Sequence, residues 1–154
     1  MVPALNEEGN CLKSIRGQKT DFDFEIILSD SGSEDSTVKI GGKIVGSGKG
    51  IANGRNAGAE AAGGRVLVFV DSDSSIPPNY LDVVVPVLDD RGIAEVSNCF
   101  RFYRESRKLK IIENTCNSYL LLKGLSGKAE ILGFNNAVGK ADFKKVDGYP
   151  RRGA

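Results

Sequence analysis

Asp71 and Asp73, two aspartates separated by one serine, have the clearest chemical potential in this sequence. They follow Val66–Val70, an apolar run rich in β-branched residues that is typical of a strand buried on both faces of a parallel sheet. In open α/β sheets, ligands bind at the carboxyl ends of the strands. Two adjacent carboxylates there favour Mg²⁺ or Mn²⁺ shared with a substrate's phosphates. The alternative is a polar loop in which both aspartates only cap backbone groups.

The elements that must position these acids alternate along the chain. We expect strands at Phe24–Leu28, Lys43–Val45, Val66–Val70, Ile93–Phe102 and Ile131–Val138. Helices are expected after an Asn6 cap, at Glu34–Thr37, at Ile51–Ala62, at Tyr80–Asp89 after an Asn79 cap, at Arg104–Lys123 and at Asp142–Val146. This order predicts the α/β class, with a mainly parallel sheet in one domain spanning residues 1–154.

Composition excludes several kinds of chemistry. The chain has no histidine, which rules out Ser-His-Asp catalysis, Cys-His catalysis and histidine-ligated metals within it. With 21 basic and 20 acidic residues, nothing points to nucleic acid as a partner. Three widely spaced cysteines, Cys11, Cys99 and Cys116, predict reduced core thiols in a cytoplasmic protein. No apolar run approaches the length of a membrane span.

The glycine-rich stretch Gly46–Gly50 resembles a phosphate loop but fails both patterns tested. A P-loop needs Ser or Thr after Gly-Lys, where Gly50 stands, and a further glycine at the position of Lys43. The dinucleotide pattern GxGxxG also lacks its third glycine. We interpret this stretch as a flexible loop between a strand and a helix.

Four motifs in order, PALNEE, DSGSEDST, GRNAGAEAAGG and VDSDSSIPPNYL, resemble the nucleotide-sugar glycosyltransferases of GT-A fold. They are most similar to the large inverting group called glycosyltransferase family 2. The resemblance implies a Rossmann-like sheet with helices on both faces. It also implies a nucleotide-sugar donor, a saccharide or lipid-linked acceptor and a divalent metal at the DSD motif.

The resemblance assigns donor contacts residue by residue. It implies that Pro3, Ala4 and Glu7 line the nucleoside and that Asp30 reads the base. A carboxylate accepts hydrogen bonds from the ring N–H of uracil, or from the N–H and amine of guanine. Arg55 is implied near the base or the diphosphate; the alternative is a solvated arginine at a helix start.

In the DSD motif, the resemblance implies that Asp71 and Ser72 face the ribose or diphosphate. It implies that Asp73, with Asp71, holds the metal. The implied reaction is displacement at the anomeric carbon with inversion, in which a carboxylate base deprotonates the acceptor hydroxyl.

Two features depart from the family pattern. Only Met1 and Val2 precede Pro3, so we expect the first strand to be missing. The catalytic base is expected beyond Ala154, and neither Asp142 nor Asp147 is assigned to that role. The sequence therefore predicts a GT-A fold that is truncated at both ends. The alternatives are a non-catalytic nucleotide-sugar-binding module and a sugar-1-phosphate nucleotidyltransferase.

A basic stretch, Arg101–Lys110, has two interpretations. It is either a solvated helix start whose side-chain stems cover apolar surface, or a surface for anionic acceptors or for a membrane face. The second interpretation would place the protein at the cytoplasmic face of a membrane. We predict that the apolar run Leu120–Leu122 belongs to the core.

Overall fold

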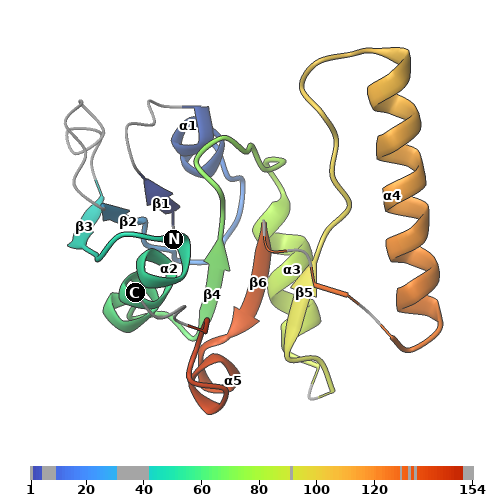
Figure 1. The fold of residues 1–154 in the computed structure, drawn as a ribbon. Coiled ribbons are helices and arrows are strands. Elements are labelled where there is room, and N and C mark those ends of the chain that lie inside the picture. Colours follow the sequence, from blue (N-terminus) through green and yellow to red (C-terminus); the bar gives the residue numbers. More distant parts are fainter. Residues whose placement is uncertain are drawn as a thin grey trace.

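The structure, a computed structural model, describes residues 2–4, 10–30, 42–90, 92–128, 130–131, 133 and 135–150. Strands and helices alternate along these residues (Figure 1). The elements are β1 (Val2–Ala4), α1 (Asn10–Arg16), β2 (Ile27–Asp30), β3 (Lys43–Gly46), α2 (Ile51–Ala61), β4 (Val66–Phe69), α3 (Tyr80–Leu88), β5 (Glu95–Ser97), α4 (Arg107–Leu125), β6 (Asn136–Gly139) and α5 (Lys140–Lys145).

The strands pair in two sheets of three. The first has the order β1-β2-β3, and both of its pairings are parallel. The second has the order β4-β6-β5, and both of its pairings are antiparallel, so β4 and β5 run in the same direction on either side of β6. The α/β class is confirmed, with parallel pairing concentrated in the first sheet.

Helices cover both faces, as β4 demonstrates. Val66, Val68 and the following Val70 face an apolar cluster that α1 and α3 supply, including Leu12 and Val84. Leu67 and Phe69 point the other way, into a cluster with Ala59 of α2 and with Phe143 and Tyr149. Because successive strand side chains alternate between faces, one short apolar strand supplies both cores.

Of the first strand, which the sequence predicted to be missing, three residues are present. Val2–Ala4 form β1 and pair with Leu28, Ser29 and Asp30 of β2. Val2 is buried in the same cluster as Val70. Three residues suffice because the parallel partner β2 satisfies the backbone groups on one side and apolar contacts hold Val2.

Other predicted boundaries shift. The strand expected at Ile93–Phe102 is only β5, because beyond Ser97 an amide side chain replaces the ladder: Asn117 of α4 bonds the backbone N–H and C=O of Phe100 at 3.1 and 2.8 Å. Asn79 precedes α3 but its side chain makes no capping hydrogen bond. The expected helix at Glu34–Thr37 and the Asn6 cap lie outside the described residues.

Helix α4 stands beside the rest of the fold (Figure 1), and none of its 19 residues, all described, is buried. The prediction that Leu120–Leu122 belong to the core is therefore wrong: Leu121 and Leu122 are 62% and 66% exposed. Within the described ranges, no helix combines the length and apolarity that a membrane crossing requires.

The cysteines divide into two kinds. All three are free thiols, as predicted, but only Cys11 is a core residue; Cys99 and Cys116 are exposed. Burial raises the pKa of the Cys11 thiol to about 11, and the nearby carboxylates of Asp71 and Asp73 act in the same direction. Cys11 therefore stays a neutral thiol at physiological pH.

The end of the described chain is fastened to α2. The Asn56 amide donates to the carbonyl of Tyr149 and accepts from its backbone N–H, both at 2.9 Å. The Tyr149 hydroxyl meets the buried Asn136 amide, whose Nδ2 donates to it at 3.0 Å. Gly148 allows this approach, with φ of 72°. A Cβ there would lie 2.6 Å from Asn56 Oδ1 and 3.1 Å from the Phe143 ring.

We expect thiol reagents to separate the cysteines. In the native protein, Ellman's reagent should react rapidly with Cys99 and Cys116 and with Cys11 only after unfolding, because the reactive species is an accessible thiolate. A Cys99→Ser/Cys116→Ser variant should show no rapid phase. Rapid reaction of Cys11 in the native variant would contradict its placement in the core.

Gly148→Ala should lower the free energy of unfolding by about 2–3 kcal/mol, because it combines positive φ with a collision. Gly127→Ala is the matched control, since Gly127 also has φ of 72° but nothing lies within 4 Å of its added Cβ. The control should lose only about 1 kcal/mol in urea titrations. Equal losses would show that the Asn56–Tyr149 contact does not constrain position 148.

Candidate functional site

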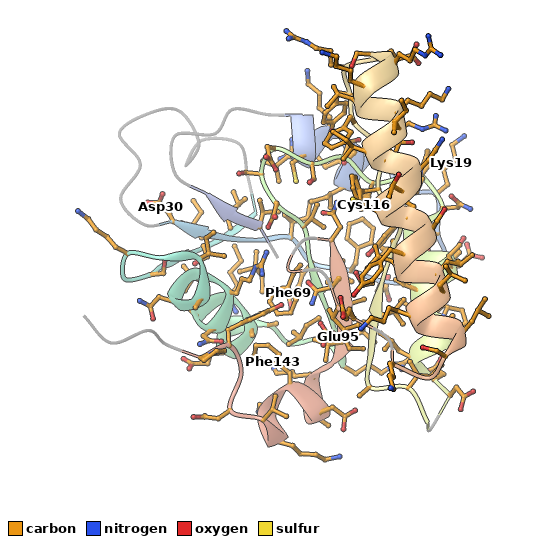
Figure 2. The ribbon with its side chains drawn as sticks, turned by 45° about the vertical axis from the view of Figure 1, so that its right-hand side comes forward. Lys19, Asp30, Phe69, Glu95, Cys116 and Phe143 are labelled. Atoms are coloured by element: carbon orange, nitrogen blue, oxygen red, sulfur yellow. The ribbon has the colours of Figure 1, made fainter. Side chains whose placement is uncertain are left out.

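The carboxyl ends of β1, β2 and β3 lie in register. Ala4 is opposite Asp30, and Asp30 is opposite Gly46. The Asp30 carbonyl accepts hydrogen bonds from the N–H and hydroxyl of Ser47 at 2.9 and 3.4 Å. Figure 2 shows Asp30 at the end of its strand. Ala4 of β1 and Asp30 of β2, two of the residues that the resemblance implies at the donor, therefore lie side by side. Pro3 also lies in β1, and Glu7 lies outside the described residues.

The two acids of the DSD motif follow β4 and differ in environment. Asp71 is half-buried, and its carbonyl accepts from the Ser74 N–H at 3.0 Å, which closes a turn over Ser72 and Asp73. Asp73 is exposed, and no described side chain bonds or pairs with it. The two carboxylates on either side of Ser72 therefore differ in their access to solvent.

Arg55 of α2 holds Asp71. Its Nη2 donates to Asp71 Oδ1 at 2.6 Å, and the Arg55 side chain is only 6% exposed. The guanidinium also lies 5.1 Å from the centre of the Tyr149 ring and 6.0 Å from that of Phe69. These aromatic faces favour a cation and keep water away from the pair.

This ion pair was not predicted. The alternative of a solvated arginine at a helix start is wrong, because Arg55 is buried. The sequence separation of 16 residues carries no helical or strand period, so pattern analysis offered no direct signal for Asp71 as the partner. Buried Arg55 Nε has no hydrogen-bond partner among the described residues.

The carboxylate oxygens of Asp71 and Asp73 are the type of ligand that a hard divalent cation prefers. Within the described ranges, no group of three or more suitable side chains could enclose a metal alone. Mg²⁺ and its chemical relatives are commonly bound by one or two carboxylates, with waters and substrate phosphates completing the shell. One fully available carboxylate and the second oxygen of Asp71 match that arrangement.

An apolar cavity of about 410 Å³ lies apart from these acids. Its lining consists mainly of core residues such as Ile15, Leu81 and Val85, with Phe22 and Phe24 at its rim. It shares no residue with the predicted donor contacts.

The chain is similar in sequence to known glycosyltransferases. The sequence profile of the family described as Glycosyl transferase family 2 matches residues 1–145. An uncharacterized glycosyltransferase of Bacillus subtilis (strain 168), YfnE, is 35% identical over 86 residues, covering 47% of this chain and 22% of YfnE. The chain therefore spans about a fifth of that relative.

Solved structures show the same fold. Glucosyl-3-phosphoglycerate synthase from Mycobacterium tuberculosis, in complex with Mn²⁺, UDP and glucosyl-3-phosphoglycerate, has a TM-score of 0.60 and 26% identity over 91% of this chain and 55% of its own. The mannosyltransferase PcManGT from Pyrobaculum calidifontis, in complex with GDP-Man and Mn²⁺, has a TM-score of 0.75 and 22% identity over 97% of this chain and 46% of its own.

The expected Rossmann-like GT-A fold is thereby confirmed. Since the family profile matches 145 consecutive residues from the first, this chain belongs to glycosyl transferase family 2.

Proposed function

We propose that this chain carries the donor site of a glycosyltransferase that moves a sugar from UDP- or GDP-sugar to an acceptor hydroxyl, with inversion and dependence on a divalent metal. The observation that supports it most is the unequal pair of acids: Arg55 fixes Asp71, while Asp73 is exposed and has no side-chain partner among the described residues. Similar solved structures contain Mn²⁺ with UDP or GDP-mannose, which agrees with this choice of donor and metal.

The nucleoside part of the donor would lie at the ends of the parallel strands. We assign Asp30 to the base, and Pro3, Ala4 and Glu7 to the walls of the nucleoside site. The register that sets Ala4 beside Asp30 supports this grouping. Uracil and guanine both present N–H donors to a carboxylate, so both nucleotides are proposed donors.

The diphosphate part of the donor would lie over the turn after β4. We assign Asp71 and Ser72 to the ribose and diphosphate, and Asp73 with Asp71 to Mg²⁺ or Mn²⁺. When bound, such a metal neutralises the charge of the departing nucleoside diphosphate. Asp71 must present its remaining oxygen in a fixed direction, and the short contact with Arg55 provides that restraint.

Arg55 is better suited to positioning Asp71 than to binding the donor directly. Its head group is buried between Asp71 and two aromatic rings, so a contact with the base or the diphosphate would require it to leave that pocket. Asp142 accepts from Lys145 at 2.7 Å within α5, and we assign no described residue the role of catalytic base.

Asp73→Asn should abolish the effect of metal on nucleotide binding. In isothermal titrations of the wild-type chain, Mn²⁺ should tighten the binding of UDP or GDP, because the metal would be bound jointly by the carboxylates and the phosphates. The variant should bind equally with and without Mn²⁺. Asp21→Asn, which removes one exposed carboxylate elsewhere, should behave as wild type.

Metal-independent nucleotide binding by the wild-type chain would contradict the metal assignment. Mn²⁺-dependent binding that survives in the Asp73 variant would contradict the residue assignment alone.

Arg55→Lys should lower both the free energy of unfolding, by about 1–3 kcal/mol, and the Mn²⁺-dependent affinity for the nucleotide. Lysine keeps the charge but loses the planar head group that bonds Asp71 and stacks on Tyr149. Arg65→Lys is the control, because the Arg65–Asp89 pair is exposed and ion pairs at the surface contribute little to stability. Equal effects of both variants in urea unfolding would argue against a special role for Arg55.

A further inference from the structure

Helix α4 presents an apolar side that the described fold does not cover. We define its outer face as Ile111, Ile112, Tyr119, Leu122 and Leu125, which are 49–80% exposed. Residues 111, 122 and 125 follow the spacing i, i+11, i+14, and residues 112 and 119 follow i, i+7. These spacings gather all five side chains on one side of the helix.

The opposite side of α4 attaches the helix to the protein through polar contacts. Glu113 accepts from the backbone N–H of Phe102 at 3.1 Å, and the Asn117 amide bonds the backbone of Phe100. Next to the outer face, Lys123 forms an ion pair with Glu130 at 2.7 Å, and the Tyr119 hydroxyl donates to the same carboxylate at 3.1 Å. Figures 1 and 2 both show α4 at the margin of the molecule. Apart from Tyr119, the outer face is aliphatic, and its four aliphatic side chains belong to neither apolar cluster of the described core.

The start of the same helix is basic. Arg101, Arg104, Arg107, Lys108 and Lys110 are all exposed, and all but Lys108 line an open depression of about 300 Å³. Arg107 and Lys108 lie four residues before Ile111 and Ile112, on the side of the outer face. Glu105 and Glu113 are the acids in that depression, and Glu113 also bonds Phe102. The outer face thus begins with positive charge and continues with apolar side chains.

We propose that the outer face of α4, with its basic start, docks on an anionic lipid surface, the helix lying along the interface. Cationic side chains and an apolar side are the two elements that such interfacial helices combine. In α4, the exposed Thr115 and Ser118 lie between the apolar side chains. Nucleic acid would leave the apolar half uncovered.

Vesicle binding tests this proposal on the whole chain. It should sediment with vesicles in which phosphatidylglycerol replaces part of the phosphatidylcholine, and not with phosphatidylcholine alone. Binding should weaken as salt rises, because the attraction between surface charges is screened. Each basic residue near an anionic surface contributes about fivefold to binding.

Two variants separate charge from apolar contact. Arg104→Glu/Arg107→Glu should reduce binding at least about 10-fold. Lys13→Glu/Lys144→Glu makes the same charge change at exposed positions of α1 and α5 and should bind almost as wild type. Leu122→Gln/Leu125→Gln keeps every charge and should also lose binding. Circular dichroism and retained nucleotide binding confirm that each variant is folded.

The absence of tryptophan provides a direct probe of docking. Leu122→Trp should show a blue shift of its emission when anionic vesicles are added. Val146→Trp, at a position 71% exposed beyond α5, should show none.

Failure to bind anionic vesicles would overturn the proposal. So would equal binding to neutral vesicles, or equal loss in the Lys13/Lys144 control. Self-association in ultracentrifugation that Leu122→Gln/Leu125→Gln abolishes, without vesicle binding, would assign the outer face to a second copy instead.

Discussion

The contact on which the site depends is the ion pair between Arg55 and Asp71. A guanidinium this deeply buried requires a charged partner, and Asp71 is the carboxylate that bonds it. Tyr149 covers the same guanidinium, and Asn56, the next residue of α2, holds the Tyr149 backbone through two hydrogen bonds. One turn of α2 thereby joins the end of β4 to Tyr149, which lies 93 residues beyond Asn56 along the chain.

This arrangement makes the two acids of the motif unequal. Asp71 has a fixed partner and a restricted direction, while Asp73 remains exposed on the turn that Ser74 closes. Two equally free carboxylates would repel and spread apart, whereas a paired one can stay beside a free one. The neutral thiol of Cys11 adds no further charge beneath them. One neutralised and one exposed carboxylate stand two residues apart in the sequence, which is the arrangement that the proposed cation and diphosphate would require.

Sequence patterns correctly predicted those features that depend on residues close together in the chain. The apolar run Val66–Val70 ending in Asp71 identified the strand and the edge where the acids lie, and the register of β1 with β2 placed Ala4 beside Asp30 as the strand ends implied. Tertiary contacts escaped prediction: the Arg55–Asp71 pair has no sequence period, and β5 ends early because Asn117 bonds the backbone of Phe100. The strand Val2–Ala4 is too short to be recognised from its own residues, because pairing with β2 stabilises it.

The misassigned run Leu120–Leu122 follows from a different limit. Apolar spacing shows that one side of a helix avoids water, but not which surface covers it. In α4, the covered side is the polar one, where Glu113 and Asn117 supply bonds that strand partners provide elsewhere. Most helices in proteins are stabilised by packing an apolar face, and an isolated helix is only marginally stable in water. Helix α4 has no buried residue and therefore lacks that stabilisation within the described fold. Its exposed leucines and isoleucines are therefore best explained by a contact outside the described fold, and the basic residues at its start indicate the charge of that contact.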